Sequence, residues 1–319
     1  MAHCSGNDSA TRWQTVSWLL CCTALAAGGG CLPSDAAHQQ AEAIWGQAGI
    51  TAGRLQKPRA MAIDDQDHLY IVDMTARIQV FDVDGNYLRG WKTPVWKNGK
   101  PSGLTISRAG QLLVADTHYY RLLVYEPEGQ AVESATIGGT MGHGPGEFGF
   151  VTDAVEDSQG HLYVAEYGDF DRIQKFSPEG EFLLQWGTHG SEPGQFRRPQ
   201  NLAIDQLNRI WVADACNHRL QVFDSQGELL FHWGEEGSEP GQMYYPYDLV
   251  LDGQGHVYVC EYGNHRIQKF SLAGESLACW GANGRGPGEL HNPWALVRDS
   301  GGRLHVLDTN NHRVQRVSF

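Results

Sequence analysis

The chain has 319 residues, of which 41% are hydrophobic and only 19% charged, and it contains 39 glycines. This composition is typical of a globular, turn-rich protein and excludes a disordered chain. The formal net charge is −13 and no cluster of Lys and Arg is present, which makes nucleic acid a poor partner because phosphate binding needs clustered cations.

We predict that residues 1–31 are an export signal. A polar start with the single Arg12 leads into the apolar run 16–27, which is shorter than the ~20 residues of a membrane-spanning helix. The following Gly28-Gly29-Gly30-Cys31 resembles the lipobox of bacterial lipoproteins, although Gly28 stands where that motif usually has Leu. The resemblance implies lipidation of Cys31, a membrane-anchored protein facing the periplasm or cell exterior, and contact with the membrane through the lipid alone. Cleavage after Ala26 is the alternative.

A repeat occupies residues 43–319, after a short tether at 32–42. Each copy has an acidic residue after an apolar strand and an Arg four to six positions later. The six pairs are Asp73/Arg77, Asp116/Arg121, Glu166/Arg172, Asp214/Arg219, Glu261/Arg266 and Asp308/Arg313.

One copy, Pro199 to Gly234, shows the structure that the repeat predicts. Apolar or alternating segments at 202–204, 210–213, 219–223 and 229–233 are separated by turn signals, and no helical periodicity interrupts them. Six such four-stranded antiparallel units predict an all-β, six-bladed β-propeller, because radial packing protects strand edges that a flat array would expose.

The motifs "DACNHRLQVF" from Asp214, "EYGNHRIQKF" from Glu261 and "DTNNHRVQRV" from Asp308 resemble the NHL repeat family. The resemblance covers roughly residues 43–319 and implies the same six-bladed propeller. The first two copies are the most divergent, and "DMTARIQVF" lacks the Asn-His pair.

The two ends of the repeat region complement each other. The last copy stops after its third strand, whereas "EAIWGQAG" at residues 42–49 carries the Trp-Gly that ends the other units. We expect Ala43–Trp45 to pair beside Val314–Val317 as the outermost strand of the sixth blade and thereby to close the ring.

Two repeated features are interpreted as structural. A catalytic site needs one asymmetric arrangement, so an acid–Arg pair copied into every blade is expected to tie strand ends together. The repeated His218, His265 and His312 invite a zinc interpretation, but equivalent residues of different blades lie on the order of 10 Å apart, whereas zinc ligands converge within about 2 Å of one ion.

The inner-strand starts differ from blade to blade, as a binding site requires. Together with the long loops on the same face, they are expected to surround the mouth of a central channel. In blade order they are Arg59-Ala60, Ser102-Gly103, Thr152-Asp153, Gln200-Asn201, Tyr247-Asp248 and Trp294-Ala295.

Asp153, Asn201 and Asp248 take equivalent positions in three consecutive blades, and oxygen ligands of this kind suit Ca²⁺. The alternative is that these side chains only bind strand-start amides or water, since a few polar residues at a pocket mouth are common.

Two functions stay open for the mouth. The expected one is a non-catalytic, monomeric module that binds a peptide, a glycan or another envelope protein through its long-loop face. The second is a metal-dependent hydrolase or lyase. Six-bladed relatives include the peptidyl-hydroxyglycine amidating lyase, whose zinc is held by three His. Two of those His follow a Pro at inner-strand starts, where this chain has Gln200, Tyr247 and Trp294, and His118 alone does not make a site.

Overall fold

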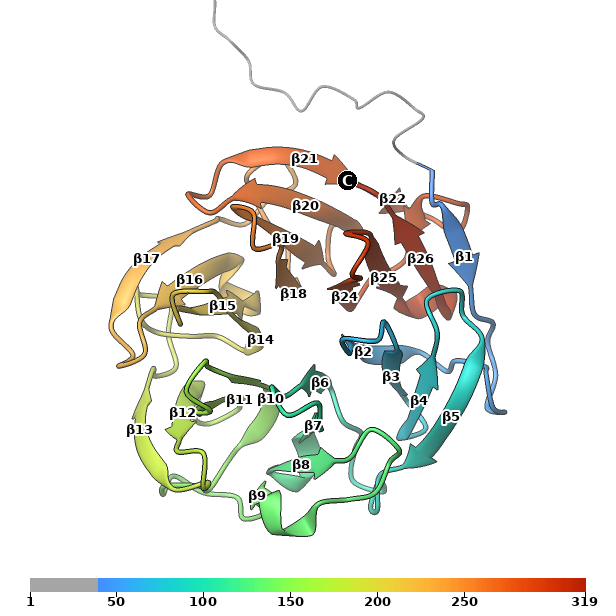
Figure 1. Ribbon diagram of the computed structural model, residues 1–319. Helices are drawn as coiled ribbons and strands as arrows, with labels where there is room; N and C mark the ends of the chain where they lie inside the picture. The colour runs from blue at the N-terminus through green and yellow to red at the C-terminus, as the bar shows by residue number, and fades with distance from the viewer. Residues whose placement is uncertain (1–39) are drawn as a thin grey trace, which may run out of the picture. The chain divides into compact units, whose positions relative to one another are not determined.

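The computed structural model describes residues 40–319, so the predicted export signal, Cys31 and most of the tether lie outside the described residues. Within residues 40–319, no helix is long and apolar enough to span a membrane. Six four-stranded antiparallel sheets stand around a common axis, and the prediction of a six-bladed all-β propeller is confirmed (Figure 1).

Each blade runs from an inner strand near the axis to an outer strand on the rim. Blade 1 consists of β2 (Pro58–Ile63), β3 (Leu69–Asp73), β4 (Arg77–Phe81) and β5 (Tyr87–Lys92). Blade 2 consists of β6 (Gly103–Ile106), β7 (Leu112–Asp116), β8 (Arg121–Tyr125) and β9 (Ile137–Gly138). Blade 3 consists of β10 (Phe150–Glu156), β11 (Leu162–Tyr167), β12 (Arg172–Phe176) and β13 (Phe182–Trp186).

The remaining blades follow the same order. Blade 4 consists of β14 (Pro199–Ile204), β15 (Ile210–Asp214), β16 (Arg219–Phe223) and β17 (Leu229–Trp233). Blade 5 consists of β18 (Pro246–Leu251), β19 (His256–Glu261), β20 (Arg266–Ser271) and β21 (Ser276–Trp280). Blade 6 consists of β24 (Ala295–Arg298), β25 (Leu304–Asp308), β26 (Arg313–Val317) and β1 (Ala43–Trp45).

The sixth blade joins the two ends of the described chain, as predicted. β1 is antiparallel to β26, with Ala43 opposite Arg316 and Trp45 opposite Val314. The Trp45 ring then reaches blade 1, where its centroid lies 5.1 Å from that of Phe81. One short strand therefore completes the last blade and packs against the first.

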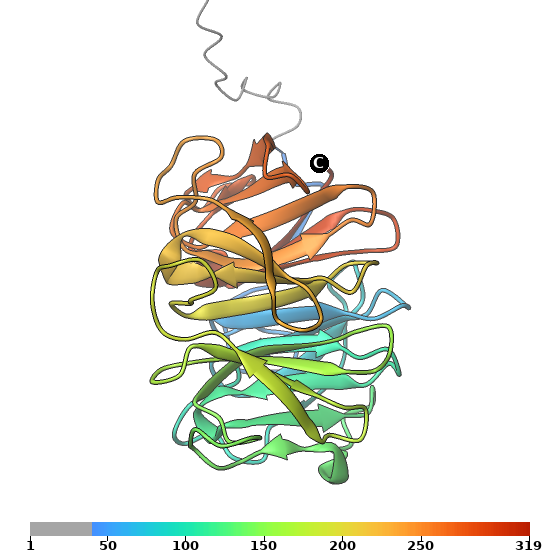
Figure 2. The same ribbon diagram turned by 90° about the vertical axis from the view of Figure 1, so that its left-hand side faces the viewer.

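The connections divide between the two faces of the ring, which Figure 2 shows edge-on. Turns between first and second strands, and between third and fourth, lie on one face. The opposite face, called here the long-loop face, carries the connections between second and third strands and the loops between blades. Three connections of the long-loop face contain the 3₁₀ turns η2 (Thr117–Tyr119), η4 (Ala215–Asn217) and η5 (Thr309–Asn311), and the turn face of blade 2 contains η3 (Glu133–Ala135).

The loops between blades are themselves ordered. In the loop before blade 6, β22 (Ala282–Asn283) and β23 (Glu289–Leu290) form a short parallel pair. The corresponding loops before blades 1, 3, 4 and 5 are closed by parallel bridges in the same place, which are Ala48 with Leu55, Met141 with Phe148, His189 with Phe196 and Glu236 with Met243. The long-loop face is thus a structured surface.

The core consists of one apolar cluster at each interface between neighbouring blades. In four blades, a Trp at or next to the end of the outer strand contributes to this packing by lying on a turn glycine of the next blade, where a Cβ atom would overlap the indole. The pairs are Trp45 with Gly85, Trp91 with Gly129, Trp186 with Gly227 and Trp233 with Gly274. This contact explains why Trp and the turn glycine recur together.

Blade 2 has Ile137 in the place of that Trp. The Ile137 side chain lies 4.0 Å from a Cβ built on Gly180 of blade 3, so the contact is looser than that of the indoles. A groove of about 610 Å³ lies here between blades 2 and 3. We expect Ile137→Trp to fill part of it and to raise the free energy of unfolding by about 1 kcal/mol. Chemical denaturation measures the effect, with Gly227→Ala as a control that should destabilise, and a loss of stability in Ile137→Trp contradicts this account of the groove.

Candidate functional site

A cavity of about 300 Å³ lies on the axis of the propeller and is lined by the inner strands of all six blades. At the long-loop face its wall includes most of the predicted mouth residues, namely Arg59, Ser102, Asp153, Gln200, Asn201, Tyr247, Asp248 and Trp294. Thr152 differs, because it is fully buried and its hydroxyl donates to the Pro199 carbonyl at 2.6 Å. The structure thus uses Thr152 to join blades 3 and 4 and not to line the cavity.

A β-bulge places three of these side chains. The register between first and second strands shifts by one residue at the start of β2, β10, β14 and β18. The extra residues are Arg59, Thr152, Gln200 and Tyr247. A bulge re-aims a side chain without ending the strand, and in three of these four blades the extra residue faces the mouth.

Three aromatic rings form one wall of the mouth, which we call the aromatic wall: Tyr247, Tyr262 and Trp294. Tyr247 stacks on Tyr262 with centroids 4.5 Å apart, and Trp294 meets Tyr247 edge-on at 4.9 Å. Tyr262 comes from the connection after β19, so blades 5 and 6 build the wall together. Burial raises the pKa of the Tyr247 phenol, which keeps this side chain neutral.

Two guanidinium groups flank the aromatic wall. The Cζ atom of Arg59 lies 5.3 Å from the Trp294 ring centroid on one side, and that of Arg198 lies 5.3 Å from the Tyr247 centroid on the other. Arg198 also lies 4.9 Å from the centroid of Tyr167. All three contacts are in the range of cation–π attraction. A locally positive mouth therefore sits in a protein of net charge −13.

His118 approaches the same mouth from blade 2. Its pKa is lowered by burial and next by the positive charge of Arg59, so the neutral imidazole is favoured. Its ring lies 5.3 Å from that of Phe150. The structure thus places His118 among aromatic and cationic neighbours.

Deeper in the cavity, Asp153, Asn201 and Asp248 form a hydrogen-bonded seam between inner strands. Asp153 accepts from the Leu202 amide at 3.0 Å, Asn201 from the Leu249 amide at 3.1 Å, and Asp248 from the Leu296 amide at 2.9 Å. Each side chain therefore binds the equivalent amide of the next blade.

The hydrogen bonds of this seam determine whether its side-chain oxygens are free to bind Ca²⁺. Asn201 also donates to Asp153 at 2.9 Å, the Thr105 hydroxyl donates to the other Asp153 oxygen at 3.2 Å, and the second Asp248 oxygen accepts from the Leu249 amide. Every side-chain oxygen of the three residues thus already accepts a hydrogen bond from the protein. Among residues 40–319, no group of three or more His, Cys, Asp or Glu side chains is placed to hold a metal. The geometry favours the alternative, an amide-binding role.

Burial raises the pKa of Asp153 to about 7 and that of Asp248 well above its usual value. A raised pKa means that the protonated form is favoured on folding, so this contribution to stability is fully present below about pH 4, the unfolded value, and is lost as the pH rises through about 7. The two carboxyl groups therefore make the inner ring more stable at mildly acidic pH than at alkaline pH.

Asp153→Asn tests this titration, because the amide keeps an acceptor for Leu202 and its NH₂ group can donate to the Thr105 hydroxyl. Relative to wild type, the variant is expected to gain about 2 kcal/mol between about pH 5.5 and pH 8, since only wild type loses a proton there. Denaturant unfolding at both pH values measures it. A constant difference would show that Asp153 does not titrate in this range.

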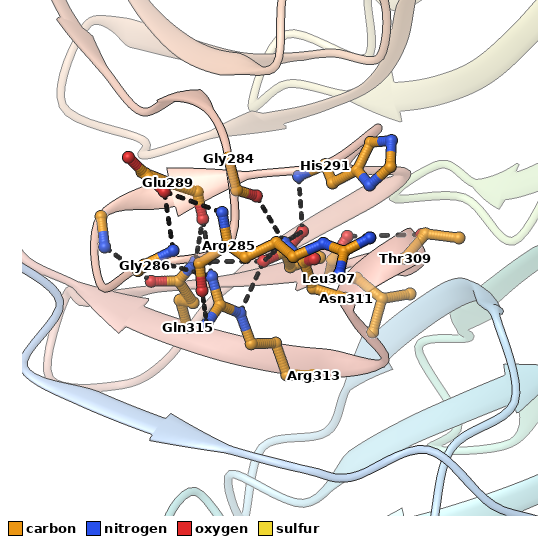
Figure 3. A network of polar contacts seen from close by, with 12 residues as sticks. Gly284, Arg285, Gly286, Glu289, His291, Leu307, Thr309, Asn311, Arg313 and Gln315 are labelled. Carbon is orange, nitrogen blue, oxygen red and sulfur yellow. Dashed lines mark hydrogen bonds and ion pairs between the residues drawn. The ribbon is translucent and has the colours of Figure 1, made fainter.

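All six acid–Arg pairs form in the structure, with nitrogen–oxygen distances of 2.5 to 2.9 Å and fully buried carboxylates. In blade 6, Figure 3 shows the Arg313 guanidinium bonded to the loop carbonyls of Arg285, Gly286 and Glu289. Asp308 receives the His291 amide at 2.7 Å. The pair fastens the loop between blades to the body of the propeller.

The repeated His residues also join neighbouring blades. The Nδ1 atoms of His218, His265 and His312 accept hydrogen bonds from the backbone amides of Tyr245, Asn292 and Lys57, at 3.1, 2.9 and 3.0 Å. Burial lowers the pKa of His218 and His265, which favours the neutral ring that this bond needs. The His312 bond closes the ring between the last blade and the first.

Three residues of the mouth were not found by sequence reasoning: Arg198, Tyr167 and Tyr262. The two tyrosines belong to the tripeptide Glu-Tyr-Gly, which lies at the end of the second strand only in blades 3 and 5. Arg198 precedes the Pro that starts β14 and has a positive φ of 61°. The departure of "EYG" from the other repeats was the available signal.

Comparisons with known proteins agree with the repeat. The family model of the NHL repeat matches residues 196–223, 243–270 and 290–317, so blades 4, 5 and 6 carry NHL repeats. A stretch of 127 residues is 37% identical to peptidyl-glycine alpha-amidating monooxygenase of Mus musculus, covering 37% of this chain and 13% of that protein. Another of 177 residues is 30% identical to NHL repeat-containing protein 3 of Mus musculus, covering 50% of this chain and 49% of that protein. The chain thus spans less than half the length of these relatives.

Solved structures share the fold. A streptogramin B lyase superposes with a TM-score of 0.61 at 12% identity, covering 82% of this chain and 93% of the lyase. A catalytically inactive virginiamycin B lyase from Staphylococcus aureus, bound to quinupristin, gives a TM-score of 0.61 at 15% identity, covering 86% and 85%. At such identities the likeness concerns the fold alone.

Proposed function

We propose that this NHL-repeat propeller is a binding module that takes its ligand at the channel mouth on the long-loop face, without catalysing a reaction. One observation carries the proposal: the aromatic wall and its two flanking guanidinium groups form an asymmetric site on an otherwise repetitive scaffold. Aromatic residues and Arg are the side chains that contribute most at binding sites. A peptide, a glycan or an exposed segment of an envelope protein is the class of ligand we propose.

Because residues 1–31 resemble an export signal, we propose that such a ligand lies outside the cytoplasm. Lipidation of Cys31 would hold the propeller at the membrane. We propose a monomer, because the propeller closes on itself through β1 and needs no second chain to complete a blade.

Peptide and glycan arrays probed with the labelled full-length protein test this function. Wild type is expected to be retained on a defined set of spots, and Tyr247→Ala to lose at least about tenfold in signal, since the aromatic wall loses its central ring. Leu207→Ala, an exposed position on the turn face, is the matched control. Thermal unfolding checks that each variant is folded. Equal retention of wild type and a folded Tyr247→Ala contradicts binding at the mouth.

A second candidate, lyase chemistry at the same mouth, is favoured by the 127-residue similarity to the amidating enzyme. The residues present speak against the zinc-dependent form, because Gln200, Tyr247 and Trp294 supply no His ligand. Incubation of purified protein with a peptidyl-hydroxyglycine substrate, beside elemental analysis of the same sample, tests it. Turnover that depends on a stoichiometric metal would show that the protein is a metal-dependent lyase and would contradict a non-catalytic binding function.

A further inference from the structure

The two arginines at the mouth lack the acidic partners that the arginines of the repeat possess. Within residues 40–319, the Arg59 side chain makes no hydrogen bond and no ion pair, and its guanidinium lies over the ring of Trp294. Arg198 uses its Nε atom to donate to Gln200 at 2.9 Å and its backbone amide to donate to Asp171 at 3.0 Å, but no carboxylate of the described chain forms an ion pair with its guanidinium. By contrast, all six repeat arginines contact a buried carboxylate.

The geometry of Arg59 leaves its donors available. A guanidinium carries five N–H groups in its plane, and stacking on the indole uses only its face. Arg59 is half-buried at the cavity wall, so water satisfies these donors incompletely. Burial lowers the pKa of Arg59, and the charge of Arg198 lowers it further. A bound anion would offset both effects, because an opposite charge favours the charged guanidinium.

The carboxylates already in the cavity do not serve as that anion. Asp153 and Asp248 accept hydrogen bonds from backbone amides of the inner strands, and burial shifts both toward their protonated forms. Neither forms an ion pair with Arg59 or Arg198. Within residues 40–319, no carboxylate therefore forms an ion pair with either guanidinium, and a bound ligand can supply the missing negative group.

We infer that the channel mouth binds a small organic carboxylate, whose carboxylate group pairs with Arg59 and whose apolar body lies against Tyr247, Tyr262 and Trp294. This inference rests on the proposed function, because it names the ligand class of the same mouth. The planar fork of a guanidinium matches a carboxylate in a two-bond arrangement. The aromatic wall favours an organic body over an inorganic ion, which would leave the rings uncovered, and a cavity of about 300 Å³ suits a small ligand.

Isothermal titration of the full-length protein with benzoate and with benzamide tests the inference. The two probes share their ring and differ in charge. Wild type is expected to bind benzoate at least about tenfold more tightly than benzamide, and Arg59→Gln to lose benzoate affinity by about tenfold or more, as expected for a hydrogen bond to a charged group. Arg59→Lys keeps the positive charge but lacks the planar fork of the guanidinium. Its affinity for benzoate should therefore lie between those of wild type and Arg59→Gln.

Arg108→Gln is the matched control, because it makes the same change of charge at an exposed turn on the opposite face. It should bind benzoate as wild type does. If Arg59→Gln does not fold, Arg198→Gln, which removes the second guanidinium, should weaken benzoate binding in the same direction. Inorganic phosphate is titrated into wild type in a separate experiment, and we expect it to bind more weakly than benzoate.

Equal affinity of wild type for benzoate and benzamide overturns the inference, and so does a folded Arg59→Gln that keeps benzoate affinity. Phosphate binding that exceeds benzoate binding also overturns it. These results can be told apart from failure of the proposed function. If the arrays retain an uncharged peptide or glycan through Tyr247, the mouth is a binding site, and only the inference that its ligand is a carboxylate is contradicted.

Discussion

Deletion of residues 32–50 is expected to destabilise the entire propeller and not only its sixth blade. The deletion removes β1, which pairs with β26 and packs Trp45 against Phe81 of blade 1. Because each blade is held by its neighbours, opening one interface exposes apolar surface on both sides. Scanning calorimetry should show one transition at a much lower temperature, and unchanged thermal unfolding would contradict closure by β1.

The single variant Trp45→Ala isolates the packing part of this effect. It should lower the free energy of unfolding by about 3 kcal/mol, which is at the lower end for removing a large aromatic side chain because Trp45 is only partly buried. Ile44→Ala is the matched control, since Ile44 lies on the same strand but is 39% exposed. Its effect should stay within about 0.5 kcal/mol.

The second large effect is expected for Asp308→Ala. The Asp308 side chain is fully buried and accepts from Arg313, Asn311 and the His291 amide. Its loss leaves the mostly buried Arg313 guanidinium without its carboxylate and frees the loop that both residues hold. Breaking a buried pair on one side costs about 3–5 kcal/mol, which denaturant unfolding can measure.

Two further variants separate a structural role from a functional one. Asp84→Ala breaks an ion pair with Arg316 in which Asp84 is 68% exposed, and it should cost less than about 1 kcal/mol. Asp308→Ala combined with Arg313→Met should recover part of the lost stability, because no unpaired charge remains. If Asp308→Ala instead keeps full stability and loses only ligand binding on the arrays, the repeated pair belongs to the binding site.

The sequence predicted the fold because the repeat carries the same local signals six times. Strand length, turn residues and the displaced Trp45-Gly46 at the chain start together determined both the blade number and the closing strand. The repeated Trp and turn glycine could be aligned but not explained, since their contact joins different blades across a distance in sequence that no local pattern shows.

The candidate site was predicted less completely. The position after each inner-strand Pro could be identified by alignment, and the structure places most of these residues at the cavity wall. Thr152 departs because its hydroxyl has a carbonyl within reach in the next blade. Tyr167 ends β11, Tyr262 follows β19, and Arg198 lies in a loop with a positive φ of 61°. Their meeting at the mouth depends on the packing of neighbouring blades, which the sequence alone did not predict.

The most direct test of ligand binding at the channel mouth is ¹⁹F NMR of protein labelled with 5-fluorotryptophan. Trp294 lies at the mouth, whereas Trp186 and Trp233 lie on the outer strands, and substitution of each by Phe assigns its resonance. Titration with a peptide or glycan retained on the arrays should shift the Trp294 resonance and leave those of Trp186 and Trp233 in place. A shift confined to the outer-strand resonances would contradict binding at the mouth.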